Sequence, residues 1–206
     1  KLSFSAYCSA ALIYLLRKQR DAAGLSLISD TVELHSLSKL SPVHAQMLYS
    51  ELNQLINRGR NKDLINKETK TSELLHFIAE NTHKRSLVII FSDIIENADI
   101  NELFSALQHL RFNKHEVILF HVSDRQKEEN FIFDNRPYKF IDLETKETVK
   151  VNPNDVREFY SNKMSTRFNE LRNKCTQYNI DIVESDINED FRKVLLSFLI
   201  KRNKLF

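Results

Sequence analysis

The feature that most constrains the fold is a pair of short apolar runs, each flanked by stretches with helical periodicity. The first run is SLVIIF at residues 86–91, and the second is EVILFHV at residues 116–122. A strand without polar alternation is buried on both faces, which is typical of an inner strand in a parallel sheet. Parallel neighbours need a long crossover, and residues 100–112 between the runs have the apolar spacing of a helix. The pattern therefore predicts an α/β fold with a mostly parallel sheet.

The rest of the chain supplies further alternating elements. The stretch 58–69 is polar and aperiodic, and it predicts a loop with at most one turn of helix. Strands at 22–28 and 31–37 are expected to form an antiparallel hairpin across the turn at Ser29 and Asp30, and a second hairpin is expected at about 138–151. Helices are predicted over 2–19, 41–57, a segment capped by Thr71 or Ser72, 153–178 and 190–204, with a last strand at 180–184.

Composition fits one soluble domain over residues 1–206, with 42% hydrophobic and 28% charged residues. The 30 basic residues are balanced by 28 acidic ones, and this balance argues against a nucleic-acid partner. A nucleic-acid interface would instead require Lys114, Arg125, Arg136 and Lys139 to gather into one positive patch.

Several function classes are excluded by what the sequence lacks. Gly24 and Gly59 are the only glycines, whereas phosphate-binding loops need several. Two distant cysteines, Cys8 and Cys175, form neither a disulfide framework nor a zinc motif, so a reducing, cytoplasmic location is expected. No apolar stretch reaches the roughly 18 residues of a membrane span.

The first helix carries the most unusual pattern. Residues 2–19 are apolar nearly all round, which predicts burial on most sides. In a doubly wound sheet a helix this apolar follows the first, central strand, and no strand precedes it here. Because the chain also begins at Lys1 without a Met, we expect it to be a piece of a longer protein whose first central strand is missing.

Six segments follow one another along the chain in a characteristic order: YCSAALIYLLRKQRDAAGLSLIS, KRSLVIIFSDI, HEVILFHVSD, FIDLETKETVKVNP, CTQYNIDIV and FLIKR. In this order they resemble a known bacterial family, labelled "domain of unknown function 58". Members of that family look like von Willebrand factor A domains and are often encoded beside MoxR-type AAA+ ATPases. The resemblance implies a three-layer sandwich with strand order 3-2-1-4-5-6. Without strand 1, the strands at 22–28 and 86–91 would flank a gap.

The resemblance also implies a metal-ion-dependent adhesion site for Mg²⁺. Its DxSxS motif would precede Lys1 and is absent from this sequence. The family's later Asp matches Asp93, which follows Ser92, and the family's Thr matches Thr69, with Thr71 as the alternative. Carboxylate and hydroxyl oxygens are the ligands that hard divalent cations prefer. This partial site is expected to bind Mg²⁺ in the intact protein and no metal in this fragment.

Each candidate also has a purely structural interpretation. Asp93 and Asp124 each follow a predicted strand, where ligands bind in open α/β sheets, but both could simply cap turns. His121 lies in a buried strand and is interpreted as a core histidine, and His76 as interfacial packing in a helix. Phe131 and Phe133 are candidates for an exposed partner surface, and Asp124 is a further candidate for contact with a partner.

Two functions from different classes follow. The first is a non-enzymatic interaction domain that binds a protein partner, such as a MoxR-type ATPase, through its strand ends. The alternative is a Mg²⁺-dependent hydrolase or phosphoryl-transfer enzyme that uses Asp93 and Asp124. The first is favoured because no nucleophile–base pair or third carboxylate lies near these residues in sequence.

Overall fold

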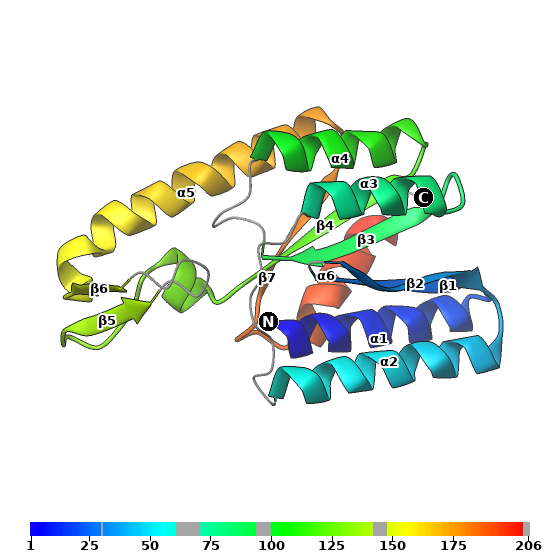
Figure 1. Cartoon of the computed structure of the whole chain (residues 1–206), viewed down its shortest axis with the longest axis horizontal. Coiled ribbons are helices and arrows are strands. Elements are labelled where there is room, and N and C mark those ends of the chain that lie inside the picture. Colours follow the sequence, from blue (N-terminus) through cyan, green and yellow to red (C-terminus); the bar gives the residue numbers. More distant parts are fainter. Residues whose placement is uncertain (30, 61–70, 94–99, 142–147, 204–206) are drawn as a thin grey trace.

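The structure is a computed structural model, and it describes residues 1–29, 31–60, 71–93, 100–141 and 148–203. Helices and strands alternate along most of the chain (Figure 1). The helices are α1 (Leu2–Lys18), α2 (Pro42–Arg60), α3 (Thr71–Asn81), α4 (Ile100–Phe112), α5 (Pro153–Gln177) and α6 (Phe191–Asn203), with a short π-helical turn η1 (Arg125–Glu129). The strands are β1 (Ala23–Ile28), β2 (Val32–Lys39), β3 (Leu87–Ser92), β4 (Glu116–Ser123), β5 (Tyr138–Ile141), β6 (Thr148–Val151) and β7 (Asp181–Asp186).

A three-stranded parallel sheet in the order β3-β4-β7 forms the centre of the fold. Leu87 on β3 lies opposite Glu116 on β4, and Ile118 on β4 lies opposite Asp181 on β7. This confirms the predicted α/β class and the parallel pairing of the two apolar runs. Within the described residues β3 is an edge strand, which agrees with the gap expected beside the strand at 86–91. All of β3 is only partly buried, so its predicted burial on both faces is wrong.

Helices cover both faces of this sheet because successive residues of β4 point to opposite sides. Val117 and Leu119 pack with α3, α4 and α5, whereas Ile118 and Phe120 pack with α1 and α6. Every residue of β4 after Glu116 is buried. Burial on both faces explains why this strand has no polar alternation.

Helix α1 contacts two different apolar clusters. Cys8 and Leu12 face the sheet and α6, while Ala6 and Ile13 face α2 and β1. Packing on two sides accounts for most of the apolar residues of α1, while Tyr7 and Tyr14 remain exposed. Both cysteines are buried free thiols, and burial raises the pKa of Cys8 and of Cys175 to about 12.

The predicted hairpin of β1 and β2 is confirmed as an antiparallel pair with irregular register. It forms a separate sheet, and in the described chain no ladder joins β1 to β3. Helix α2 begins as predicted, because Ser41 Oγ accepts the N–H of His44 at 3.4 Å and Pro42 is the first helical residue. It continues to Arg60, so residues 58–60 are helical where a loop was predicted, and the rest of that predicted loop, 61–69, lies outside the described residues.

A separate arm extends from the carboxyl side of the sheet (Figure 1, left). It consists of η1, the antiparallel hairpin β5–β6 and the N-terminal half of α5. The hairpin predicted at 138–151 is thus confirmed on both sides of residues 142–147, which lie outside the description. Among the residues described, no helix combines the length and apolarity needed to cross a membrane.

Candidate functional site at the strand ends

The carboxyl ends of the parallel strands meet at one edge of the sheet. Ser92 on β3 lies opposite His121 on β4, and Ser123 on β4 lies opposite Asp186 on β7. Ligands of open α/β sheets bind outside this edge. We call the polar residues that gather here, Lys1, Asp93, Asp124, Glu128, Asp186 and Asn188, the strand-end rim.

Two carboxylates of the rim converge on one cation. Lys1 Nζ lies 3.2 Å from Asp93 Oδ2 and 2.7 Å from Glu128 Oε2. Burial works to lower the pKa of the Lys1 ammonium, but hydrogen bonding and charge from Glu128 and Asp93 outweigh it and raise the pKa. Asp93 is the open member, with 62% of its side chain exposed against 28% for Glu128. A positive charge is therefore bound where β3 ends.

The carboxylates that follow β4 and end β7 are engaged differently. Asn188 Nδ2 donates to Asp124 Oδ1 and to Asp186 Oδ1, both at 3.0 Å. Asp124 Oδ1 also accepts the N–H of Lys127 at 3.3 Å, which caps η1. Both aspartates are buried. Asp124 therefore caps the turn that follows β4, which was its structural interpretation, and Asn188 bridges two buried carboxylates.

His121 lies just inside the rim and is buried, with 5% exposure. Burial lowers the pKa of its imidazole to about 4, with a smaller lowering by Lys1 and an opposing effect of Asp93. Its ring lies 5.4 Å from that of Phe168. The core position expected for His121 is confirmed, and the ring is neutral at pH 7.

The other predicted site residues are only partly placed. Thr69 lies outside the described residues. Thr71 is the first residue of α3, and its side chain is not described. Ser92 is the last residue of β3, directly before Asp93. Within the described ranges, no group of three or more His, Cys, Asp or Glu side chains is arranged to hold a metal ion.

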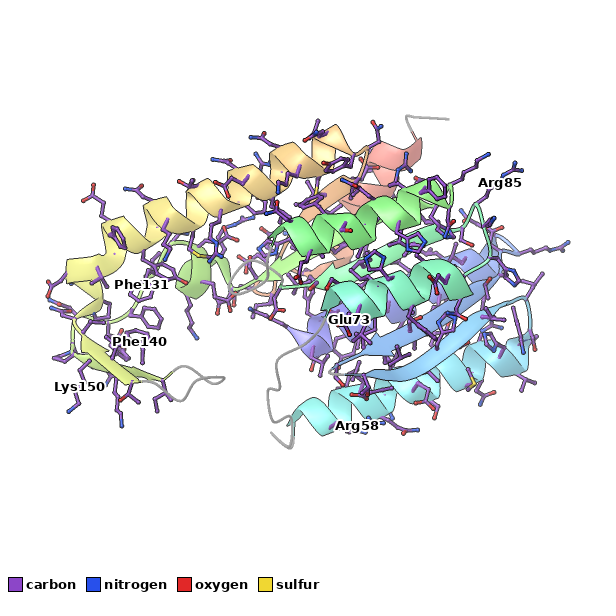
Figure 2. All side chains as sticks on the ribbon, turned by 45° about the horizontal axis from the view of Figure 1, so that its top comes forward. Arg58, Glu73, Arg85, Phe131, Phe140 and Lys150 are labelled. Atoms are coloured by element: carbon purple, nitrogen blue, oxygen red, sulfur yellow. The ribbon has the colours of Figure 1, made fainter. Side chains whose placement is uncertain are left out.

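The expected exposure of Phe131 is wrong. This residue is buried, 9% exposed, at the centre of an aromatic cluster in the arm, where Phe131 and Phe140 lie close together (Figure 2). Phe133 is half-buried in the same cluster. Phe131 contacts Phe140 of β5 and Tyr160 of α5, so these rings form a small core instead of a surface.

The positive patch required for nucleic-acid binding does not form. Arg125 follows the carboxyl end of β4 among Glu129, Glu184 and Glu189. Lys114 precedes the other end of β4, which at about 3.3 Å per residue is more than ~20 Å away.

Some rim residues were missed by the sequence analysis. Asp186 and Asn188 follow a predicted strand, so the rule that found Asp93 could have found them. Glu128 and Lys1 had no such signal, because a turn after β4 and the start of α1 bring them to Asp93.

These features define the class: an α/β protein with a parallel sheet, helices on both faces, and a charged rim at the strand ends. Over residues 1–169 the sequence matches the family described as "Protein of unknown function DUF58". The chain belongs to this family. Among the curated proteins and among the solved structures, none matches this chain.

Proposed function

We propose that this chain is an interaction domain, similar to a von Willebrand factor A domain, that binds a protein partner at the strand-end rim. The observation that carries the proposal is the convergence of Asp93 and Glu128 on one cation, Lys1 Nζ. The rim holds a cation between two carboxylates, and Asp93 is open to solvent. This arrangement suits a partner that binds the same cation from outside. The partner that the family resemblance suggests is a MoxR-type AAA+ ATPase in the cytoplasm.

A divalent cation fits this proposal in part. Asp93, Glu128 and Ser92 supply the oxygen ligands that Mg²⁺ prefers, and Mg²⁺ commonly keeps several waters beside one or two carboxylates. Bound there, Mg²⁺ would offer a free position to a carboxylate of the partner. Lys1 would have to leave Asp93 and Glu128, because its ammonium lies between them.

The enzymatic alternative, phosphoryl transfer or hydrolysis by Asp93 and Asp124, is less well supported. Asp124 accepts hydrogen bonds from Asn188 and from the backbone of Lys127, and only 13% of its side chain is exposed. A carboxylate held in this way is poorly placed to bind a metal–phosphate substrate.

The test is binding of the purified ATPase to the protein, measured by biolayer interferometry with and without Mg²⁺. We expect Asp93→Asn to weaken binding about tenfold, which corresponds to about 1.4 kcal/mol for an exposed charge at an interface. The matched control is Asp134→Asn, which removes another exposed carboxylate in the arm. Equal affinity of the Asp93→Asn variant and the unchanged protein would contradict a role of the rim.

Titration calorimetry with MgCl2 and MnCl2 separates the metal question from the partner question. Heats that disappear in both Asp93→Asn and Glu128→Gln would support a cation site at the rim. Partner binding that depends on Asp93 without any Mg²⁺ heat would assign the rim to direct charge recognition.

A further inference from the structure

We propose that His76 and His109 form a binding site for a divalent transition-metal ion of tetragonal preference, such as Ni²⁺, between α3 and α4. Their Nδ1 atoms lie 2.9 Å apart, and their ring centroids 5.2 Å apart. Both rings are half-buried, so they are neither sealed in the core nor free in solvent. This site is separate from the strand-end rim and does not depend on the proposed function.

The two helices hold this pair in a fixed position. They lie side by side over the sheet (Figures 1 and 2), and residues of both belong to one buried cluster that includes Leu75, Ala79 and Leu107. Their seam carries two further polar contacts, one before and one after the histidines. Ser72 Oγ donates to Glu102 Oε2 at 3.5 Å, and Asn113 Nδ2 donates to the Ala79 carbonyl at 2.8 Å.

These contacts show that α3 and α4 run in the same direction, because the partner's number rises along both helices. Along the seam, residue 72 meets 102, residue 76 meets 109, and residue 79 meets 113. The imidazoles therefore lie between two points where the helices are already joined. Ligands on rigid, packed elements lose little freedom when an ion binds, which favours binding by even two side chains.

The 2.9 Å between the nitrogens is the length of an ordinary N–H···N hydrogen bond, and it is also compatible with two neighbouring ligand positions around a metal ion. Imidazole nitrogens bind these metals at about 2.0–2.1 Å, so two ligands at a right angle are ~2.9 Å apart, whereas two tetrahedral ligands are ~3.3 Å apart. The His76–His109 separation of 2.9 Å matches neighbouring positions of an octahedral or square-planar ion. Imidazole ligands suit Ni²⁺ and Cu²⁺, which adopt these geometries.

Binding requires a change of tautomer without net loss of a proton. In the present hydrogen bond one Nδ1 carries the proton and the other accepts it. When the ion binds, both Nδ1 lone pairs point at the metal, and the donor ring moves its proton from Nδ1 to Nε2 through solvent.

Water fills the remaining coordination positions. Among the described residues no third His, Cys, Asp or Glu completes a metal-binding group around this pair. The third imidazole of this region, His115, is buried, and its Nδ1 accepts the N–H of Ser86 at 3.3 Å. The protein therefore supplies two histidine ligands, and the remaining coordination positions of the ion are available to other ligands.

The test is titration calorimetry of NiCl2 into the protein at pH 7.5. We expect one site whose affinity falls at least about tenfold in His76→Gln and in His109→Gln, because each change removes half of the protein ligands. The control is His83→Gln, which changes an exposed histidine just beyond the end of α3. Circular dichroism of each variant shows whether it remains folded.

A second readout identifies the ligands directly. With Cu²⁺ as the probe, electron paramagnetic resonance should show coupling to two nitrogens in the unchanged protein and to fewer in either variant. The proposal is overturned if the folded protein binds no Ni²⁺, or if His83→Gln weakens binding as much as His76→Gln does. Asp93→Asn should leave Ni²⁺ binding unchanged, which separates this site from the rim.

Discussion

Replacing Phe131 by glycine should destabilise the protein less than replacing it by alanine. At most positions the order is the reverse, because glycine gains more freedom in the unfolded chain. Phe131 has a φ of 49°, in the left-handed region that L side chains avoid and glycine adopts freely. The aromatic cluster around this residue holds its backbone in that conformation.

The magnitude follows from the contacts. The centroid of the Phe131 ring lies 4.4 Å from the ring centroid of Tyr160, 5.0 Å from that of Phe133 and 5.4 Å from that of Phe140. Losing a buried phenylalanine ring costs about 3–5 kcal/mol, and both variants lose it. Alanine keeps the backbone strain of about 1–2 kcal/mol, whereas glycine relieves it. Glycine also stabilises the unfolded chain by about 0.4–1 kcal/mol, because it has more conformational freedom there than alanine. The glycine variant should therefore be more stable by about 0.5–1 kcal/mol.

Hydrogen exchange followed by mass spectrometry is the appropriate assay, because the cluster belongs to the arm. Exchange protection of β5 and β6 should fall in both variants, less in Phe131→Gly, while protection of β4 is retained. Phe131→Leu serves as the control for partial loss of the ring with the strain kept. An alanine variant that protects the hairpin better than the glycine variant would refute the account of strain at this residue.

Three further predictions concern the core and the sheets. Lowering the pH from 7 to 4 should reduce the unfolding free energy by about 3 kcal/mol through His121, because its pKa of about 4 in the folded protein lies below the unfolded value of about 6.5 and mainly the unfolded chain takes up the proton in this range. Urea unfolding of His121→Leu should lack this part of the pH dependence. An identical pH dependence in both proteins would contradict the prediction. Gly24→Ala should lower the unfolding free energy, measured by urea unfolding, by about 1–3 kcal/mol, because the new Cβ would lie 2.4 Å from the Ser36 carbonyl oxygen across the hairpin. An unchanged unfolding free energy would show that β2 moves away freely. Leu107→Ala, at a fully buried position in α4, should lower the unfolding free energy by about 2–5 kcal/mol, and a loss below about 1 kcal/mol would argue against the packing of α4 on the sheet.

Much of the fold was predictable because its signals are local. The apolar run of β4 predicts its burial, and the helix between β3 and β4 favours the parallel pairing of these two strands. The hairpins β1–β2 and β5–β6 join neighbouring segments, so alternation and turn residues suffice to predict them. The apolar composition of β3 did not predict its edge position, because an apolar run does not say how many neighbours a strand pairs with, whereas the gap implied by the family resemblance did place this strand at an edge.

The sequence by itself also determined that acidic residues follow the parallel strands, and thus that Asp93 and Asp124 lie at one edge of the sheet. Only the tertiary structure decided how they are used. It joined Asp93 to Lys1 and Glu128, engaged Asp124 with Asn188, and turned Phe131 inward. It also brought His76 to His109 across a helix seam. These contacts join residues up to 92 positions apart, and they depend on how whole elements pack.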